Sequence, residues 1–360
     1  MRPPWLRKVP LALVFSVFLL AGFGILSVYS ATASRGGLFA WRQLNWCGLG
    51  LVLFLLMGYF NYRSLLGISY LFYACALILL VGVLVFGEVR QGAQRWFQVG
   101  PLAVQPSEFA KLATLMTLAH FLGSIQPWDD KNRALIISLI LVLVPMALIA
   151  KQPDLGSAIV FLPMAIGLFF LWGIRYRYLI VAALTGLVLA PVFWAFLHDY
   201  QRKRILVFLN PKLDPLGAGY TALQAKIAVG SGGLWGKGFL KGTQGQLDFV
   251  PEHHTDFIFC VVGEEFGFLG VILLLVLYGV LFRAIFQAME STTDTRAKLL
   301  GAGVISILFA QVFVNIGMSI GLMPITGIPL PLVSYGGSSF LATAFALGLI
   351  HSIHRQRTIF

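Results

Sequence analysis

Long runs of apolar residues alternate along this chain with short polar segments. A helix needs about 20 apolar residues to cross a bilayer core, and about ten runs of that size are present. The predicted helices cover residues 10–30, 43–60, 65–87, 107–123, 134–150, 157–173, 178–197, 266–283, 297–322 and 336–354. The pattern therefore predicts an all-α polytopic membrane protein, with residues 1–360 forming a single integral membrane domain.

The first apolar run could be mistaken for a cleaved signal peptide, because basic residues precede it and Ala31-Thr32-Ala33 follow it. A signal peptide has an apolar core of about 7–15 residues, whereas this run has roughly twenty. We expect it to be retained as a membrane helix.

Lys and Arg residues are unevenly distributed between the two sets of connections. If the N-terminus is cytoplasmic, the inner segments contain Arg2, Arg7, Lys8, Arg63, Lys131, Arg133, Arg175, Arg177, Arg283, Arg296, Lys298, Arg355 and Arg357. The short outer segments then contain only Arg35, Arg42, Arg90, Arg95 and Lys151. Cytoplasmic loops carry the positive excess, so we predict that both termini are cytoplasmic. Residues 198–265, between helices 7 and 8, become one large extracytoplasmic loop.

Composition agrees with a membrane protein. Hydrophobic residues make up 58% of the 360 residues and charged residues 11%, whereas soluble domains have about a quarter charged. The net charge of +12 follows from the excess of basic residues on the inner side and does not indicate nucleic-acid binding. Cys47, Cys75 and Cys260 form neither a disulfide framework nor a metal motif.

Two charged residues lie inside a predicted membrane helix. Glu108 and Lys111 are three residues apart in QPSEFAKLATL, which puts them on one helix face within pairing distance. Charges inside membrane helices usually face the bundle interior or a wet cavity. The pair could be a structural ion pair, or one wall of a polar cavity that opens outward.

Polar residues in two outer connections are further candidates. Asp154 in KQPDLG could cap a helix N-terminus or contribute to the same cavity. Arg95 and Trp96 lie together in GAQRWFQVG. Trp96 could be an interfacial anchor, or the two side chains could bind a phosphate and a sugar.

The long outer loop contains several basic residues. Arg202, Lys203 and Arg204 precede an apolar stretch and suit an interfacial helix on anionic headgroups. Lys226 falls in YTALQAKIAVG, a predicted short amphipathic helix. Residues 230–245 are rich in glycine and include Lys237 and Lys241. Their backbone amides and lysines could cradle a phosphate, or the segment could be a flexible surface loop.

The segment PEHHTDFIFC crowds Glu252, His253, His254 and Asp256 just before an apolar run. We expect Pro251 to begin a helix. The cluster could bind a metal, but no HExxH motif is present. It could also supply a general base, for which Asp256 is best placed, or it could be an ordinary polar cluster at the interface.

The last outer connection, residues 323–340, has three prolines and no charged residue. Because prolines remove amide donors, we expect irregular backbone here. It could form the rim of a lipid-entry groove or a plain interfacial turn.

Taken in order, QPSEFAK, QPDLG, NPKLDPLGAGY, the Gly-rich loop, PEHHTDFIF and PLPLVSYGGSS resemble the motifs of the shape, elongation, division and sporulation (SEDS) family. The similarity extends over nearly the whole chain. Without a longer polar N-terminal extension, the chain resembles the rod-shape (RodA) branch more than the division (FtsW) branch.

This resemblance implies an inverting peptidoglycan glycosyltransferase of the bacterial cytoplasmic membrane. Such an enzyme polymerises lipid II into β-1,4-linked glycan at the outer face during cell elongation. The resemblance marks Asp256 as the catalytic residue, with Glu108, Lys111, Trp96 and Asp154 supporting the cavity. Candidate diphosphate-binding residues are Arg95, Arg204, Lys226, Lys237 and Lys241.

Asp256 could act as the general base or as a ligand for a divalent cation such as Mg²⁺ or Mn²⁺; no organic cofactor is expected. The family resemblance also implies a class B penicillin-binding transpeptidase and other elongation proteins as partners. Two alternatives remain at this stage, a lipid II flippase and a scaffold for the transpeptidase.

Overall fold

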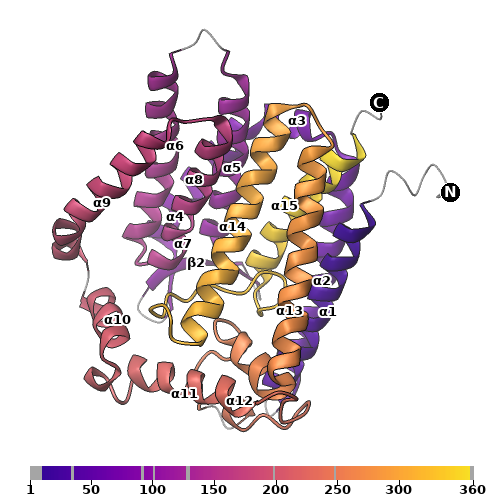
Figure 1. Ribbon diagram of the computed structural model, residues 1–360, viewed down its shortest axis with the longest axis vertical. Helices are drawn as coiled ribbons and strands as arrows, with labels where there is room; N and C mark the ends of the chain where they lie inside the picture. Colours follow the sequence, from indigo (N-terminus) through magenta and orange to yellow (C-terminus); the bar gives the residue numbers. More distant parts are fainter. Residues whose placement is uncertain are drawn as a thin grey trace.

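The computed structural model describes residues 10–33, 36–90, 93–99, 102–126, 130–197, 199–246 and 249–356. Arg2, Arg7, Lys8, Arg35 and Arg357, which entered the orientation argument, lie outside these residues, as does His198 at the start of the predicted outer loop. The first half of the chain (Figure 1) contains α1 (Leu11–Ala31), α2 (Leu38–Tyr59), α3 (Tyr62–Gly67), α4 (Ser69–Phe86), β1 (Glu88–Arg90), β2 (Ala93–Val99), β3 (Leu102–Val104), α5 (Pro106–Ser124), α6 (Lys131–Lys151), α7 (Leu155–Ile159) and α8 (Phe161–Trp172).

The second half contains one further apolar helix, a group of short helices and three long helices. They are α9 (Tyr176–Phe196), α10 (Asp199–Leu209), η3 (Pro211–Leu213), α11 (Ala218–Ser231), α12 (Thr243–Gln246), α13 (Ile258–Glu290), α14 (Thr295–Ser319) and α15 (Gly337–Arg355). Each of the ten predicted runs corresponds to a helix, or to the pair α7–α8. The predicted all-α polytopic fold is therefore confirmed.

Seven of the described segments are long and apolar enough to cross a membrane: α1, α2, α4, α6, α7–α8, α13 and α14. A shorter apolar stretch covers Tyr176–Val192 of α9. The eighth predicted helix begins earlier than expected, at Ile258, because two helical pieces join across a non-helical Gly267 with φ 63°.

The remaining predicted spans, α5 and α15, contain several polar residues and lie inside the bundle. Most residues of both helices are buried. Helices α4, α8 and α14 pack around α5, and α2 packs along α15. This arrangement keeps the polar side chains of α5 away from lipid, where they would be costly.

Small residues allow α2 and α15 to pack closely. A side chain at Gly50 would collide with Phe340, one at Gly58 with His351, and one at Gly348 with the α2 backbone. Membrane helices associate through such close packing, because lipid provides no hydrophobic drive between them.

A small antiparallel sheet, which the sequence reading did not predict, connects α4 to α5. Its order is β1-β2-β3, with Glu88 opposite Trp96 and Phe97 opposite Val104. Strands β1 and β3 have only 3 residues each, and the sequence of β2, AQRWFQV, does not alternate between apolar and polar residues. The sheet places Arg95 in the middle of β2.

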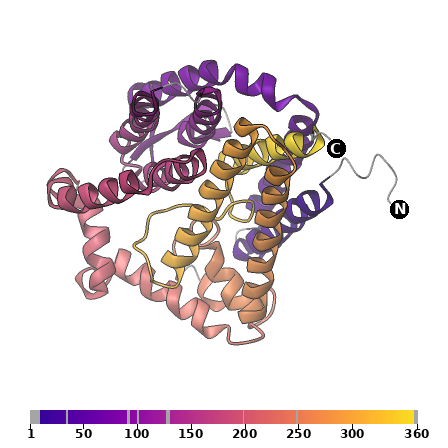
Figure 2. The ribbon, with the colours of Figure 1, turned by 45° about the horizontal axis from the view of Figure 1, so that its top comes forward.

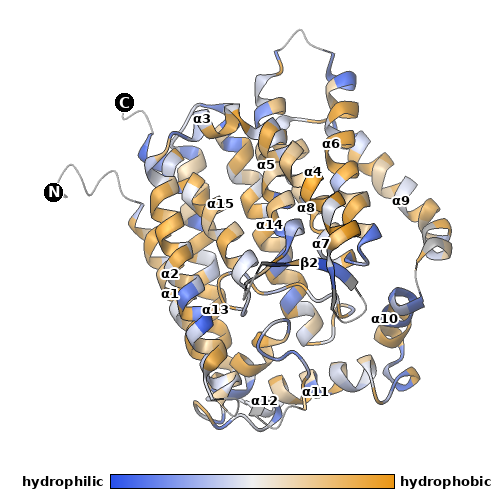
Figure 3. Ribbon diagram, turned by 180° about the vertical axis from the view of Figure 1, so that it is seen from behind, coloured by the Kyte–Doolittle hydropathy of each residue, from blue (hydrophilic) through white to orange (hydrophobic). Residues whose placement is uncertain are grey.

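Helix α9 stands at the edge of the molecule in both Figure 1 and Figure 2, and contains no buried residue among those the structure describes. Helices α10 to α12 run across the lower end in Figure 1, opposite the end at which α15 finishes. Viewed from behind and coloured by hydropathy (Figure 3), β2 and α10 include strongly hydrophilic residues, whereas most long helices are hydrophobic.

Irregular backbone was predicted for residues 323–340, and the structure shows it over residues 321–336; α15 begins at Gly337. Ile328, Leu330, Leu332 and Val333 are nonetheless buried. The hydroxyl of Tyr278 in α13 donates to the Pro331 carbonyl at 2.6 Å. Irregular backbone at membrane depth is tolerated where protein covers it, and here the neighbouring helices do so.

Candidate active site

Asp256 lies in a turn just before α13. The amides of Thr255, Asp256 and Phe257 all donate to the Glu252 carbonyl, at 3.1, 3.1 and 3.3 Å. Glu252 has φ 53°, a left-handed conformation that is unusual for a non-glycine residue. The predicted helix start at Pro251 is therefore wrong. The chain instead makes a compact turn that ends at Ile258.

The side chain of Asp256 is only partly exposed and faces the irregular 321–336 segment. A Cβ placed on Gly327 would lie 3.1 Å from Oδ2 of Asp256. Burial raises the pKa of Asp256 from 3.8 to about 6. The negative charge of Glu252 contributes to this increase, while Arg95 and Arg204 oppose it. A carboxylate in this state can exchange protons near neutral pH.

Asp154 connects three elements near this turn. As predicted for an N-cap, Oδ1 accepts from the Ser157 amide at 3.1 Å at the start of α7. The same oxygen lies 3.7 Å from Nη1 of Arg95 on β2. Oδ2 accepts from the Gln105 side chain at 3.0 Å, just before α5. Asp154 therefore fixes Arg95 and the start of α5 relative to each other.

Helix α10 brings two more polar side chains to the same region. The Tyr200 hydroxyl donates to the Pro153 carbonyl at 2.6 Å, beside Asp154. Arg204 donates to the Ile325 carbonyl at 3.1 Å, and its guanidinium lies 5.8 Å from the centre of the Tyr200 ring. The electrostatic influence of Arg95, Asp154 and Arg204 reaches Tyr200 as well as Asp256. These residues therefore form one charged site.

Arg204 and Lys226 line a common groove. Its other walls are mostly apolar, and its lining consists of Arg204, Val207, Phe208, Pro211, Ala218, Ala222, Lys226, Met318, Gly321, Met323, Pro324 and Ile325. Lys226 lies on α11, the predicted amphipathic helix. The predicted cations from two separate helices therefore converge on one segment next to Gly327.

Trp96 does not share a face with Arg95. Adjacent residues in a strand point to opposite faces, and both residues lie in β2. The interpretation in which they bind a phosphate and a sugar side by side is therefore not supported by this arrangement. Trp96 is partly exposed and pairs with Glu88 in the sheet.

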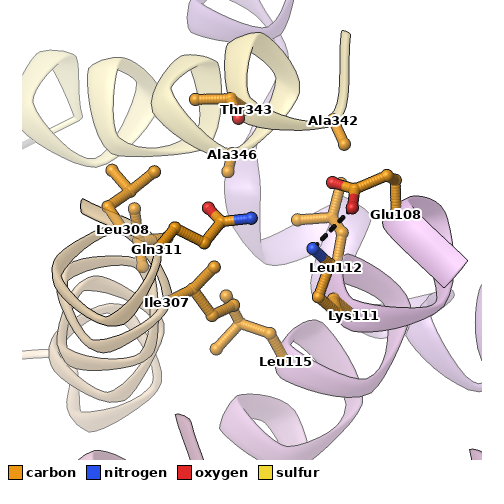
Figure 4. A pocket seen from close by; sticks show the side chains of 11 residues that line it. Glu108, Lys111, Leu112, Leu115, Ile307, Leu308, Gln311, Ala342, Thr343 and Ala346 are labelled. Carbon is orange, nitrogen blue, oxygen red and sulfur yellow. Dashed lines mark hydrogen bonds and ion pairs between the residues drawn. The ribbon is translucent and has the colours of Figure 1, made fainter. Parts of the chain in front are cut away.

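Glu108 and Lys111 form the predicted ion pair, with Nζ and Oε1 2.7 Å apart and both side chains about 5% exposed or less. They line a pocket between α5, α14 and α15, in which the Gln311 amide points toward the pair (Figure 4). This pocket leaves a volume of about 30 Å³ for the centres of water molecules, which is room for about two waters. Asp256, Arg95 and Arg204 are not among the residues that line this pocket, so the pair belongs to a separate, inner pocket.

The Gly-rich loop binds carboxylates of its own chain. Glu264 accepts from Lys237 Nζ at 2.6 Å, from the Thr243 amide at 2.8 Å and from the Gln244 amide at 3.1 Å. Glu265 accepts from the Gly242 amide at 3.4 Å. This geometry contradicts the phosphate-cradle interpretation for these amides and for Lys237, because buried acids already occupy them. Lys241 is exposed.

Two basic residues of α10 also make contacts with other parts of the chain. Arg202 donates to the carbonyls of Trp194 and Ala195 at the end of α9, and Lys203 pairs with Asp214 at 3.1 Å. These contacts satisfy the last carbonyls of α9 and connect α10 to the turn that follows it.

The histidines of PEHHTD do not form a metal site. Nδ1 of His253 lies 2.9 Å from the Val250 carbonyl and Nε2 lies 2.7 Å from the Ala31 carbonyl, so both ring nitrogens face protein oxygens. His254 packs against Phe39 and Tyr335. No cluster of three or more His, Cys, Asp or Glu side chains suited to a metal occurs within the described part of the chain. Cys47, Cys75 and Cys260 are free, as predicted.

Several residues of the site were missed from the sequence. Gln105, Tyr200, Asn315 and Ser334 carry no charge at neutral pH, and none was assigned a role. Gln105 and Ser334 lie inside the motifs QPSEFAK and PLPLVSYGGSS, and Tyr200 is two residues before the basic run that begins at Arg202, so their positions gave a usable signal. Asn315 is a fully buried amide in a membrane helix, and such polar residues are often functional.

A membrane-embedded helical bundle with a partly buried acid beside converging cations defines a polytopic membrane protein with the features of a group-transfer enzyme. Over residues 11–359 the chain matches the family described as "Cell cycle protein" (FtsW, RodA and SpoVE), and it belongs to that family. It is 43% identical to peptidoglycan glycosyltransferase MrdB of Escherichia coli K12, over 93% of this chain and 90% of that protein. It is 37% identical to stage V sporulation protein E of Bacillus subtilis, over 96% of each chain.

Solved structures show the same fold. A chain in the structure described as "Structural coordination of polymerization and crosslinking by a peptidoglycan synthase complex" superimposes with a TM-score of 0.83 at 37% identity, covering 96% of this chain and 97% of that chain. The crystal structure of the rod shape determining protein RodA of Thermus thermophilus gives a TM-score of 0.73 at 33% identity, covering 99% of this chain and 100% of that one.

Proposed function

We propose that this chain is a peptidoglycan glycosyltransferase that polymerises lipid II during cell elongation, with Asp256 as the general base. Relatives in its family are named peptidoglycan glycosyltransferases. The observation that carries the catalytic assignment is the placement of Asp256. It is a partly buried carboxylate with a pKa of about 6, and Arg95 and Arg204 are near enough to affect that pKa.

The chemistry follows from this placement. With a pKa of about 6, about nine tenths of Asp256 is ionised at pH 7 and can accept a proton. Asp256 takes the proton of the acceptor sugar's 4-hydroxyl as that oxygen attacks C1 of the donor sugar. The bond from C1 to the lipid diphosphate breaks, the diphosphate leaves with the bonding electrons, and inversion gives a β-1,4 link. General base catalysis of this kind contributes about 10²–10⁴-fold.

The leaving diphosphate concentrates negative charge and requires cations directed at it. Arg95 and Arg204 are best placed, because both act electrostatically on Asp256. Lys226 shares the groove with Arg204. Nε of Arg95 is buried and makes no hydrogen bond within the described part of the chain, so one donor of this guanidinium is left without an acceptor. Lys241 stays a weaker candidate, and Lys237 is occupied by Glu264.

A divalent cation would fit this site only together with substrate. Mg²⁺ commonly uses one or two protein carboxylates and completes its shell with water and phosphate oxygens. Asp256 and its neighbour Glu252 would be the protein ligands, and the ion would neutralise charge on the leaving diphosphate.

The supporting residues act through the scaffold. Asp154 holds Arg95 against the start of α5, and the Glu108–Lys111 pair stabilises the inner pocket. Trp96, on the opposite face of β2, anchors the sheet at the membrane interface.

For the topology, we propose that both termini are cytoplasmic and that residues 198–265 lie outside, as one loop of a single membrane domain in the bacterial cytoplasmic membrane. The bias of Lys and Arg toward the proposed inner segments supports this orientation. The active site then faces outward. One neighbour is described as part of a peptidoglycan synthase complex that coordinates polymerization and crosslinking, which supports a class B transpeptidase as the partner.

The test is polymerisation of labelled lipid II by the purified protein with its transpeptidase partner in detergent, where flipping across a bilayer cannot contribute. We expect glycan ladders from the wild type and none from Asp256→Asn. Ladders that persist in Asp256→Asn would exclude Asp256 as the base. No ladder from the wild type, in the presence or absence of Mg²⁺, would favour a flippase or a scaffold.

A further inference from the structure

Three consecutive carbonyls of the catalytic turn are held by donors from a distant part of the chain. The Tyr335 amide donates to His254 O at 3.0 Å. The Ser334 hydroxyl donates to Thr255 O at 2.6 Å. The Asn315 side chain donates to Asp256 O at 2.8 Å. The turn that contains Asp256 is therefore held by hydrogen bonds from α14 and from the segment before α15.

Asn315 has the most specific of these roles. Its side chain on α14 is completely buried. Nδ2 donates one bond to Asp256 O and a second to Ile328 O, both at 2.8 Å. An amide NH₂ group has two hydrogens, so this arrangement uses both of them. One side chain thereby joins the catalytic turn to the segment that contains Gly327.

This bridge sets the environment of the carboxylate. Asp256 Oδ2 lies against Gly327, the residue directly before Ile328. Because Asn315 fixes the backbone on both sides of this contact, it fixes the distance between the carboxylate and its wall. The Tyr335 amide and the Ser334 hydroxyl hold the two residues before Asp256, so Asn315 is the donor that acts on the Asp256 backbone itself.

The amide is retained at a cost to stability. With Nδ2 directed at two carbonyls, Oδ1 is buried and has no hydrogen-bond partner within the described ranges. An unpaired buried acceptor is destabilising. An apolar residue would avoid this cost but could not hold the two carbonyls, so packing alone does not account for an asparagine here.

We propose that Asn315 is the positioning residue for Asp256: its two donated hydrogen bonds hold the catalytic turn against the Gly327 segment and so orient the carboxylate toward the acceptor hydroxyl. This proposal rests on the proposed function, in which Asp256 is the general base. Asn315 itself does not contact substrate, and a shift of about 1 Å in a catalytic group can cost about 10²-fold in rate.

The experiment compares Asn315→Leu, which keeps a similar volume without donors, with Ser319→Ala in the same purified complex. Ser319 is equally buried one turn later on α14, and its hydroxyl bonds to the Asn315 carbonyl of its own helix. We expect Asn315→Leu to lower kcat for lipid II polymerisation by about tenfold or more with an unchanged KM, and Ser319→Ala to leave both within about twofold. Melting temperatures establish that the compared proteins are folded.

A double variant separates positioning from general stabilisation. General base catalysis contributes about 10²–10⁴-fold, so Asp256→Asn keeps a slow rate that is measured with more enzyme and far longer incubation than the ladder assay. If Asn315 acts through Asp256, adding Asn315→Leu to Asp256→Asn leaves this residual rate unchanged. An unchanged kcat in folded Asn315→Leu, or an equal loss in both backgrounds, would overturn the proposal. If Asn315→Leu does not fold, Asn315→Ser, which keeps one donor, is judged by the same two criteria. Full activity of Asp256→Asn alone would instead refute the proposed function.

Discussion

The charge of Asp256 should lower the stability of the folded protein, and removing it should therefore stabilise the fold. Burial raises the pKa of Asp256 from 3.8 to about 6. A difference of about two pKa units, at 1.36 kcal/mol each, corresponds to about 3 kcal/mol. The folded state binds the proton more tightly than the unfolded chain does. The free energy of unfolding therefore falls as pH rises through the window from 3.8 to about 6.

Asp256→Asn keeps the shape of the side chain but cannot ionise. We expect this variant to be inactive and yet more stable than the wild type above pH 6, by up to about 3 kcal/mol. Below the unfolded pKa of 3.8 both forms are neutral, so the advantage should disappear. Thermal melting of the detergent-purified proteins, followed by tryptophan fluorescence over a pH series, measures the difference.

Asp214 provides a control of opposite sign. Its pKa is lowered, first by the hydrogen bond from the Ala218 amide and then by Lys203. Asp214→Asn should therefore be less stable than the wild type at neutral pH, with the difference shrinking as pH falls below 3.8. If Asp256→Asn melts below the wild type at pH 8, or if its advantage is the same at every pH, the reasoning about the buried charge is wrong.

Three further predictions concern the site and its support. The rate of lipid II polymerisation at saturating substrate should fall below pH 6 as Asp256 becomes protonated. If the midpoint of this decrease in the pH–rate profile lies more than about one pH unit from 6, the general-base role is contradicted. Gly327→Ala should lower kcat by about 10–100-fold, because Gly327 has φ 75° and the new methyl would lie 3.1 Å from Asp256 Oδ2. Gly230→Ala, where no atom lies within 4 Å of the new methyl, is the matched control and should be nearly neutral. Glu108→Gln should destabilise the fold by about 3–5 kcal/mol, because it leaves Lys111 unpaired. The double variant Glu108→Gln, Lys111→Met should recover most of that loss in thermal melts. No recovery would mean that the pair does more than stabilise the fold.

The helices could be predicted from the sequence because the bilayer demands one strong, simple pattern. An apolar stretch of fixed length has few other interpretations, and each of the ten predicted runs corresponds to a helix or helix pair. The boundaries were less certain where glycine intervened. Gly267 allows α13 to begin at Ile258 with a kink, and apolar periodicity does not register such a break.

The site could be predicted only in part. Asp154, Arg95, Arg204 and Asp256 were flagged individually as charged residues in a weakly charged chain. Their convergence depends on a short sheet and on α10, neither of which produces a distinctive periodic pattern. The phosphate site predicted in the Gly-rich loop was wrong for its amides and Lys237, although these groups have the chemistry that such a site needs. The buried acids that occupy them, Glu264 and Glu265, stand 20 or more positions further along the chain.

The arrangement of donors explains why a general base can lie in a turn rather than on a helix. A carboxylate in a turn can approach an extended substrate from a partly open side, but turns are usually mobile. Here His254, Thr255 and Asp256 each have their carbonyl bonded to the α14–α15 region. Those bonds give the turn the rigidity of the bundle while leaving the side chain of Asp256 partly exposed. The cations that lower its pKa come from β2 and α10, whereas Glu252 of the same turn raises it. The base is therefore held by the α14–α15 region, while cations from elsewhere in the fold oppose the effect of burial.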